Sequence, residues 1–334
     1  MPELSVKKHR SGIIIDYDNE RLTLDTGLPD EPALLSHAHA DHMSGVNLAA
    51  CVFSTGLTFD VVDARNNLTF RAREVIEYES TFNVRNIRVT AYDAGHVLGS
   101  AMFLMEFPDG LRVLYTGDFN VVDSLVHQAA HPIESDVLIM ETTYGTPDWI
   151  FPERTVTHSN IVQAANEETE NGRIPVFKAY SLGKAQEAIY LLQNKGFNVI
   201  SGNHVIDSVS SLYSKASHNL KFISSKSRHL ADFVDEKAVI ISSSPKHTRL
   251  NLRRRLPKDK VTELESRMEE YSLSGWTLGK YSERGYPLSA HSDFQGLASF
   301  VTGVNPKIVY CFTDNAIPFS GYLVGTGVNA VPLE

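Results

Sequence analysis

Short alternating runs of apolar and polar residues fill the first 145 positions of the chain. Strict alternation predicts half-buried β-strands, and a short continuous apolar run is typical of a strand buried on both faces. Two pairs of runs flank turn sequences, Asp18-Asn19-Glu20 and Pro108-Asp109-Gly110, and are predicted to form hairpins. The predicted strands are 11–16, 21–25, 84–92, 101–107, 111–115 and 136–141.

The pattern changes near residue 150, where helical and strand periodicities begin to alternate. Alternation at this spacing predicts βαβ units and a parallel sheet, and therefore a second α/β domain. The predicted helices are 157–172 and 185–192, and the predicted strands are 174–180, 197–200 and 238–244.

Composition narrows the class of protein. The 334 residues are 42% hydrophobic and 21% charged, as in soluble globular proteins with one large or two medium domains. Only Cys51 and Cys311 are present, too few for a disulfide framework or a thiolate metal cluster. The N-terminus has no apolar signal core and no run is long enough to span a membrane, so we expect a cytoplasmic protein.

The net charge of −9 argues mildly against a nucleic-acid partner. One segment, 242–260, nevertheless concentrates positive charge against a single carboxylate, Asp259. Charge alone leaves two readings open, a surface that binds nucleic acid and a solvated helix face. The basic residues are Lys246, Arg249, Arg253, Arg254, Arg255, Lys258 and Lys260.

The most informative segment is Ser36-His37-Ala38-His39-Ala40-Asp41-His42, directly after the apolar run 33–35. Strand ends lead into loops, and loops present reactive groups. Imidazole and carboxylate are ligands that zinc prefers, and a catalytic metal keeps one position open for water. The segment therefore predicts a catalytic metal site rather than a loop that is histidine-rich by chance.

Two later segments supply candidate ligands. His96 lies in a glycine-flanked turn between two predicted strands, and Asp118 follows the predicted strand 111–115 in the turn Thr116-Gly117-Asp118. A carboxylate at this place could bridge two metals. Each turn alone is a weak signal, but together with the histidine run they predict a two-metal hydrolase.

His-x-His-x-Asp-His, a lone histidine and a strand-terminal aspartate, in this order, resemble the metallo-β-lactamase superfamily, and Asp25 matches its upstream aspartate. Three further segments resemble the β-CASP nucleases, which include the cleavage and polyadenylation factor nuclease, RNase J and the DNA repair nuclease Artemis. They are Ala94-Gly95-His96-Val97-Leu98-Gly99-Ser100-Ala101, Glu141-Thr142-Thr143-Tyr144-Gly145 and Leu288-Ser289-Ala290-His291-Ser292-Asp293-Phe294.

The resemblance implies an αββα metallo-β-lactamase sandwich, residues 1–146 and 287–334, with an α/β β-CASP domain, 147–286, inserted into it. It also implies two zinc ions, the second bound more weakly or replaced by manganese. One ion would be held by His37, His39, His96 and Asp118, and the other by Asp41, His42 and the shared Asp118. Asp25 would orient the histidine loop without binding metal.

The implied reaction is hydrolysis of a phosphodiester to a 5′-phosphate and a 3′-hydroxyl, with Asp41, Glu141 and His291 as catalytic residues. We expect His291 to protonate the departing oxygen. Glu141 would orient the His291 ring and keep it cationic, since a carboxylate partner raises the pKa of an imidazole. Substrate-binding candidates outside the metal motifs are Ser181, Lys184, Arg253, Arg254 and Arg255.

One position departs from the pattern. RNA-cleaving relatives usually carry a further histidine after a late strand, DNA-cleaving relatives tend to carry valine, and Thr313 occupies this place here. Water or Asp314 could complete the second metal site instead. Cys311 is several times more readily explained as a buried strand residue than as a ligand.

The motifs favour an RNA-processing nuclease of the cytoplasm, and Thr313 favours the alternative of a DNA exonuclease. A small-molecule metallo-hydrolase and a scaffold without catalytic activity are weaker alternatives, because the chain has the inserted domain and retains the predicted ligands. Exo- or endonucleolytic action stays open, as does a homodimer.

Overall fold

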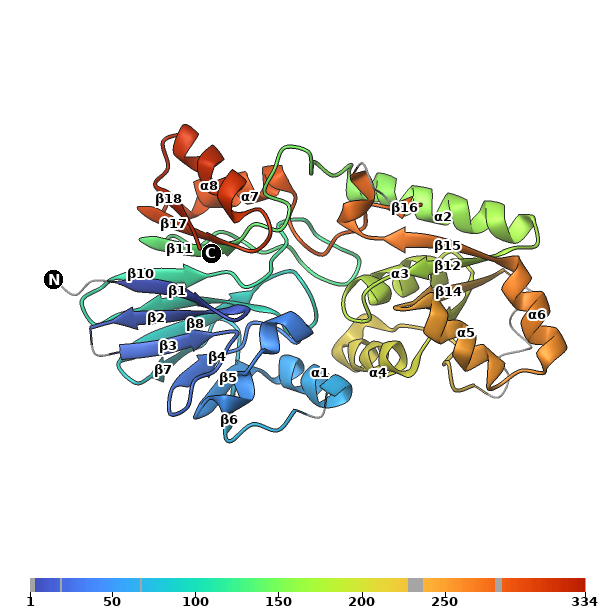
Figure 1. Ribbon diagram of the computed structural model, residues 1–334, viewed down its shortest axis with the longest axis horizontal. Coiled ribbons are helices and arrows are strands. Elements are labelled where there is room, and N and C mark those ends of the chain that lie inside the picture. The colour runs from blue at the N-terminus through green and yellow to red at the C-terminus, as the bar shows by residue number, and fades with distance from the viewer. Residues whose placement is uncertain (1–3, 19, 67, 228–236, 280–283, 334) are drawn as a thin grey trace. The chain divides into compact units, whose positions relative to one another are not determined.

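A computed structural model describes residues 4–18, 20–66, 68–227, 237–279 and 284–333 (Figure 1). The chain divides into two compact units. Unit 1 comprises Met1–Asp123, His127–Ile150 and Ala290–Glu334, and unit 2 comprises Ser124–Val126 and Phe151–Ser289.

The first sheet of unit 1 begins with antiparallel pairing and continues with parallel pairing from β3 onward. The hairpin around Asp18 is confirmed. The sheet has the order β1 (Ser5–His9), β2 (Gly12–Tyr17), β3 (Glu20–Leu24), β4 (Pro32–Leu34), β5 (Cys51–Thr55), β6 (Arg73–Ile76).

The second sheet of unit 1 is antiparallel at one end and parallel at the other. The hairpin around Pro108-Asp109-Gly110 is confirmed, with Gly110 at φ 91°. The sheet has the order β18 (Ala330–Pro332), β17 (Ile308–Phe312), β11 (Val137–Glu141), β10 (Arg112–Tyr115), β9 (Ala101–Glu106), β8 (Ile87–Asp93), β7 (Thr81–Val84).

The two sheets of unit 1 share an apolar core. Ile15 and Leu22 of the first sheet and Phe103 and Tyr115 of the second belong to one buried cluster. On its other face the second sheet packs against α7 (Phe294–Val304) and α8 (Ala316–Gly325). The α/β fold predicted for this part of the chain is therefore confirmed.

Two predictions for unit 1 need correction. The strand predicted at 84–92 is β8 except at its start, because Val84 ends β7 and Arg85, with φ 54°, turns the chain between β7 and β8. The helix α1 (Gly56–Asn66) was not predicted; it follows β5 directly and buries Phe59, Val61 and Val62.

Unit 2 is built on a parallel sheet of the order β13-β14-β12-β15-β16, which confirms the prediction of parallel pairing. Its core contains Val176, Ile200 and Ile240 from the strands and Leu252 and Leu264 from the helices. In chain order the elements are α2 (Arg154–Glu170), β12 (Ile174–Lys178), α3 (Lys184–Gln193), β13 (Asn198–Ser201), α4 (His204–Tyr213), η3 (Ser214–His218), β14 (Ala238–Ser242), α5 (Pro245–Arg253), α6 (Lys258–Arg267), β15 (Met268–Leu273), η5 (Gly275–Leu278) and β16 (Gly285–Tyr286).

The helices of the described segments are too short or too polar to cross a bilayer.

Candidate metal centre

The histidine run lies in a loop at the end of β4. His37 and Ala38 are fully buried, and residues 40–43 form the 3-10 turn η1 (Ala40–Met43). Asp25, which leaves β3 at φ 51°, accepts hydrogen bonds from the Ser36 amide at 2.6 Å and the Ser36 hydroxyl at 2.5 Å. The start of the loop is therefore held by a buried carboxylate of the neighbouring strand.

Asp25 has two more donors. Tyr115, at the end of β10, donates its hydroxyl at 2.9 Å, and Nδ1 of His42 lies 2.7 Å from Oδ2. The carboxylate thus connects the histidine loop to the second sheet. These contacts support the orienting role predicted for Asp25.

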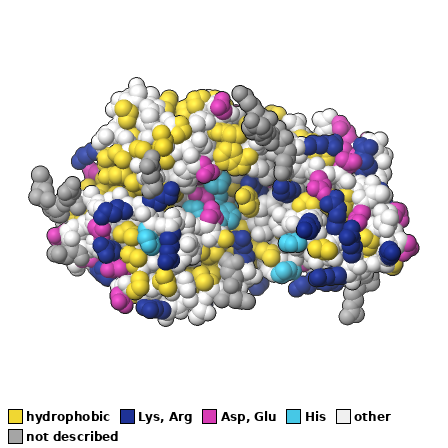
Figure 2. Space-filling view, in the orientation of Figure 1, with side chains coloured by type: hydrophobic (Ala, Val, Ile, Leu, Met, Phe, Trp, Pro, Cys, Tyr) yellow, Lys and Arg dark blue, Asp and Glu magenta, His cyan; other side chains and the backbone are white. Residues whose placement is uncertain are grey.

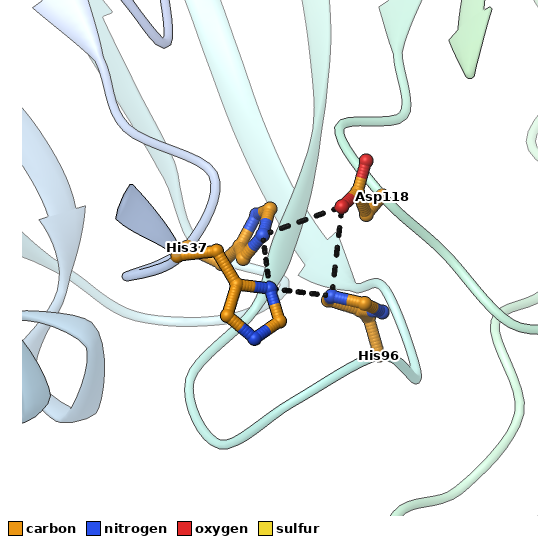
Figure 3. A group of neighbouring side chains, drawn as sticks. His37, His96 and Asp118 are labelled. Atoms are coloured by element: carbon orange, nitrogen blue, oxygen red, sulfur yellow. Dashed lines mark hydrogen bonds and ion pairs between the residues drawn. The ribbon is translucent and has the colours of Figure 1, made fainter. Parts of the chain in front are cut away.

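Four donor atoms meet beside this loop. Nδ1 of His39 lies 3.0 Å from Nε2 of His37 and 3.1 Å from Nε2 of His96. Oδ2 of Asp118 lies 3.5 Å from Nε2 of His37 and 3.6 Å from Nε2 of His96. Figure 3 shows His37, His96 and Asp118 pointing toward one another from three separate segments of the chain.

The outer nitrogens of two rings are already occupied. Nδ1 of His96 lies 2.8 Å from the Ala290 carbonyl, which can only accept, so His96 carries its proton there and turns a lone pair toward the group. Nδ1 of His37 lies 2.9 Å from the Ser36 hydroxyl. Partners of this kind fix ring orientation in metal sites.

Burial also sets the protonation state of the rings. It lowers the pKa of His37 and His96 well below the usual value and that of His39 to about 3. The three imidazoles are therefore neutral at pH 7, the form that coordinates metal.

The donor set fits a zinc-like cation. Zinc bonds of about 2.0–2.1 Å in a tetrahedron place the ligand atoms about 3.3 Å from one another. The four separations given above lie between 3.0 and 3.6 Å. A cation also explains why three neutral imidazoles, of which His37 and His96 are buried, converge on one carboxylate, since hydrogen bonds among these groups cannot satisfy all of them.

A second, more open group continues from Asp118. Its other oxygen, Oδ1, lies 3.2 Å from Nε2 of His42, and this nitrogen is 3.9 Å from Oδ2 of Asp41. The Asp41 side chain is 75% exposed, whereas that of Asp118 is 5% exposed. Asp118 thus faces both predicted ligand sets, and Asp41 lies at the solvent side.

His42 and Asp118 carry opposite pKa shifts. Burial alone would lower the pKa of His42, but Asp118 and Asp25 raise it well above the usual value. Burial alone would raise the pKa of Asp118, but His42 and His291 lower it well below the usual range. Asp118 is therefore ionised, the form in which a carboxylate can bind a cation.

Glu141 and His291 form a pair next to Asp118. Nδ1 of His291 lies 2.8 Å from Oε1 of Glu141, and its Nε2 lies 3.9 Å from Oδ2 of Asp118. Glu141 ends β11, is fully buried and accepts from the amides of Phe119 and Thr143. The carboxylate is thereby fixed, and it directs Nε2 of His291 toward the donor group.

Thr313 lies directly after β17 with φ 78°, an unusual conformation for a β-branched residue. Its hydroxyl accepts a hydrogen bond from the Thr142 amide at 2.8 Å. Cys311 is buried within β17, and burial raises the pKa of its thiol to about 12. Its placement agrees with the prediction of a core cysteine.

Unit 2 contains the remaining predicted residues. Lys184, at the start of α3, is buried, and its Nζ lies 4.5 Å from the centre of the Tyr180 ring. Ser181 is half-buried, and its carbonyl accepts a hydrogen bond from Gln186.

The basic run forms α5, the start of α6 and the turn between them. Arg253 makes two hydrogen bonds of 2.8 Å to Glu265, and Arg255 donates to the Lys226 carbonyl, while Arg254 is exposed. The charge of Arg253 is thus compensated within the unit, which weakens the prediction that it binds substrate.

The sequence did not identify several residues that shape the centre. Ser36, Tyr115 and the Ala290 carbonyl orient the loop and rings, but their contacts come from distant segments and have no local sequence signal. The glycine before Asp118 is different. Gly117 has φ 54°, and a side chain there would come within 2.6 Å of Ser36 Cβ, so the turn requires glycine.

A family comparison now identifies part of the chain. Residues 29–170 match the model described as beta-lactamase superfamily domain. The model thus matches less than half of the chain. The matched residues include the histidine run, His96, Asp118 and Glu141, and end at Glu170, the last residue of α2.

Curated relatives cover different parts of the chain. A "Probable DNA ligase" of Opitutus terrae is 26% identical over 92% of this chain and 29% of its own length. An "RNase J-like protein" of Methanocaldococcus jannaschii is 31% identical over 55% of this chain and 51% of its own length. An "Endoribonuclease YSH1" of Eremothecium gossypii is 33% identical over 48% of this chain and 25% of its own length. The chain thus spans about half of one relative and less than a third of the other two.

A solved structure matches the whole chain. A protein of unknown function from Enterococcus faecalis V583 covers 100% of this chain and 97% of its own, with a TM-score of 0.64 and 12% identity. At this identity the match supports the fold only.

Proposed function

We propose that this chain is a metal-dependent nuclease that hydrolyses phosphodiester bonds, with RNA as its first candidate substrate. The observation that carries the proposal is the converging donor group of His37, His39, His96 and Asp118 with the Glu141–His291 pair beside it. Relatives named RNase J-like protein and Endoribonuclease YSH1 support both the reaction and the substrate.

Two zinc ions fit the donors. His37, His39, His96 and Asp118 would hold one, and Asp41, His42 and Asp118 the other. The second ion would bind more weakly, or be manganese, since Asp41 is largely exposed and His42 must lose its proton to become a ligand. When bound, divalent ions lower the pKa of water and polarise the phosphoryl group.

The residues of the chain have separate tasks. Glu141, fixed by two amides, orients Nδ1 of His291, so that Nε2 can give a proton to the departing oxygen. Asp25 keeps the histidine loop in place. Asp118 holds negative charge between the two groups of ligands.

The domain assignment follows the resemblance to β-CASP nucleases. We assign 1–146 and 287–334 to the metallo-β-lactamase core and 147–286 to an inserted β-CASP domain. The parallel sheet of unit 2, which begins after the Glu141 segment and ends before His291, supports this assignment.

DNA is the second candidate substrate. The relative named as a DNA ligase aligns with 92% of this chain, more than the RNA-processing relatives do. Thr313 also stands where RNA-cleaving relatives usually carry histidine, and its hydroxyl is engaged with the Thr142 amide.

The deciding experiment digests matched single-stranded RNA and DNA, labelled at either end, with zinc or manganese present. We expect faster cleavage of RNA and products with a 5′-phosphate, and the size ladder distinguishes exonuclease from endonuclease action. Faster cleavage of DNA would support the second candidate. No cleavage of either strand by metal-loaded protein, with Asp118→Ala as the inactive control, would refute a nuclease.

A further inference from the structure

Two adjoining cavities open at the carboxyl ends of the unit 2 strands. Their volumes are about 560 Å³ and 400 Å³, and both are lined by Lys178, Ser243 and Ser272. These three residues lie at or next to the ends of β12, β14 and β15. We call the larger space the cationic cavity and the smaller one the aromatic cavity.

The topology of the sheet favours a ligand here. From β12 the chain builds β13 and β14 on one side, and then crosses to place β15 on the other side. In parallel sheets such a switch point leaves a crevice at the carboxyl ends of the strands, where ligands usually bind.

The cationic cavity is positive although the chain has a net charge of −9. Four cationic side chains and one carboxylate, Glu270, line it. Arg249 pairs with Glu270 at 2.5 Å, and Arg284 pairs with Glu269 at 3.0 Å, so both guanidinium groups are already held by carboxylates. Lys178 and Lys246, which also line the cavity, are both exposed to solvent. Figure 2 shows Lys and Arg side chains gathered over the part of the surface that unit 2 occupies.

The aromatic cavity presents two large rings. Tyr180 is 67% exposed and Trp276 is 41% exposed, although both line the cavity. Trp276 is placed by η5, which the Ser274 side chain caps by accepting from the Trp276 amide. Lys184 lies over the Tyr180 ring with its Nζ 4.5 Å from the centre, a cation–π contact that fixes the ring.

We propose that these cavities form a subsite for a single-stranded nucleic acid segment, with a base against Tyr180 or Trp276 and neighbouring phosphates at Lys178 and Lys246. Exposed rings beside a cationic groove are the combination that binds single strands without sequence preference. The subsite rests on the proposed function for the class of its ligand. It uses residues of unit 2 other than the sequence-predicted Arg253, Arg254 and Arg255.

The test measures binding of a fluorescein-labelled phosphorothioate oligonucleotide, which resists cleavage, to the full metal-loaded chain by fluorescence anisotropy. We expect Tyr180→Ala and Trp276→Ala each to weaken binding by about 5- to 100-fold, since a stacked base contributes at this level. Trp276→Phe keeps a ring and should restore most of the affinity. Equal affinity in both alanine variants would overturn the subsite.

The lysines are tested by salt dependence. Lys178→Ala and Lys246→Ala should each reduce the slope of log Kd against log salt by about 0.7, the value for one contact to a single-stranded phosphate. Lys221→Ala, an exposed lysine outside the cavity linings, serves as the matched control. A slope unchanged in both cavity variants would also contradict the proposal.

Two further measurements separate the subsite from the proposed nuclease. Bis(p-nitrophenyl) phosphate has no neighbouring nucleotides to occupy the subsite, so the rate of its hydrolysis should be the same in Tyr180→Ala and Trp276→Ala as in the original protein. If the chain proved not to be a nuclease, loss of oligonucleotide binding in these variants would still support the subsite. Uridine monophosphate binding as tightly as the oligonucleotide would instead show a nucleotide pocket and overturn the strand assignment.

Discussion

Asp118 connects three groups of side chains in the candidate centre. Oδ2 faces His37 and His96, Oδ1 faces His42, and His291 approaches Oδ2 at 3.9 Å. A carboxylate with both oxygens engaged in this way can serve two cations at once.

His291 and the proposed ligands can be separated by one substitution. His291→Ala should lower kcat by about 10²- to 10⁴-fold, because a positioned general acid contributes at this level. The zinc content, measured by atomic emission, should not change, since the four converging donors lie on other residues. Loss of metal in His291→Ala would show that His291 is a ligand, and an unchanged kcat would exclude His291 as the general acid.

Among the elements, the turn after β10 is closely constrained by the histidine loop. Gly117 and Gly110 both have positive φ, at 54° and 91°. A Cβ at Gly117 would lie 2.6 Å from the Cβ and Oγ of Ser36, whereas a Cβ at Gly110 would have no atom within 4 Å. The two glycines therefore form a matched pair.

Gly117→Ala should reduce both bound metal and stability, because it displaces Ser36 and with it the histidine loop. We expect the free energy of unfolding to fall by about 2 kcal/mol or more. For Gly110→Ala it should fall by about 1 kcal/mol, because there only the positive φ is unfavourable for alanine. Urea unfolding and metal content are the measurements. Equal losses in the two variants would show that contact with Ser36 is unimportant.

The pairing of α2 with α3 depends on a buried carboxylate. Glu187 lies 2.7 Å from Nε of Arg154 and 2.9 Å from Nε2 of His158. Burial alone would raise the pKa of Glu187, but these two residues lower it to about 2. A depressed carboxyl pKa contributes stability above its unfolded value, near 4.5, and loses it as the pH falls toward 2.

Glu187→Gln should therefore destabilise the chain by about 3 kcal/mol at pH 7, from the difference of the two pKa values. The difference between the variant and the original protein should shrink as the pH falls below 4.5. Urea unfolding at several pH values measures it, with Glu167→Gln on the exposed face of α2 as control. A difference independent of pH would contradict the assigned pKa.

Much of the element order could be predicted from local pattern. Hairpins, βαβ units and the histidine loop have signals within a few residues, and these were predicted correctly. Arg85 has no such signal, because a positive φ outside glycine depends on the surrounding structure. The strand predicted at 84–92 therefore begins before the turn that precedes β8, and β7 was not predicted. The residues that orient the donor group were not predicted for a similar reason, since the Ala290 carbonyl, which contacts His96, is 194 positions away in the sequence.

At the scale of the whole molecule, the two units divide the chemistry. The proposed ligands, Glu141 and His291 belong to unit 1, whereas Lys178, Tyr180, Lys246 and Trp276 belong to unit 2. The net charge of −9 is a sum over the whole chain, so it does not reveal that the lining of one cavity in unit 2 is mainly positive. The predicted homodimer stays a prediction.

Metal removal should consequently act on one unit. A ligand that binds only the folded state adds about 2.7 kcal/mol of stability at a concentration of 100 times its Kd. We expect the bound metal to stabilise mainly the segments that contact it. After chelation, hydrogen exchange should rise in 36–43, 94–100 and 116–120 and stay unchanged in β12 and β14. His96→Ala, which lacks one donor, should show a smaller response to the chelator. Equal gains in exchange in β12 and β14 would mean that unit 2 shares the folding energy of the metal, and the assignment of the centre to unit 1 alone would be wrong.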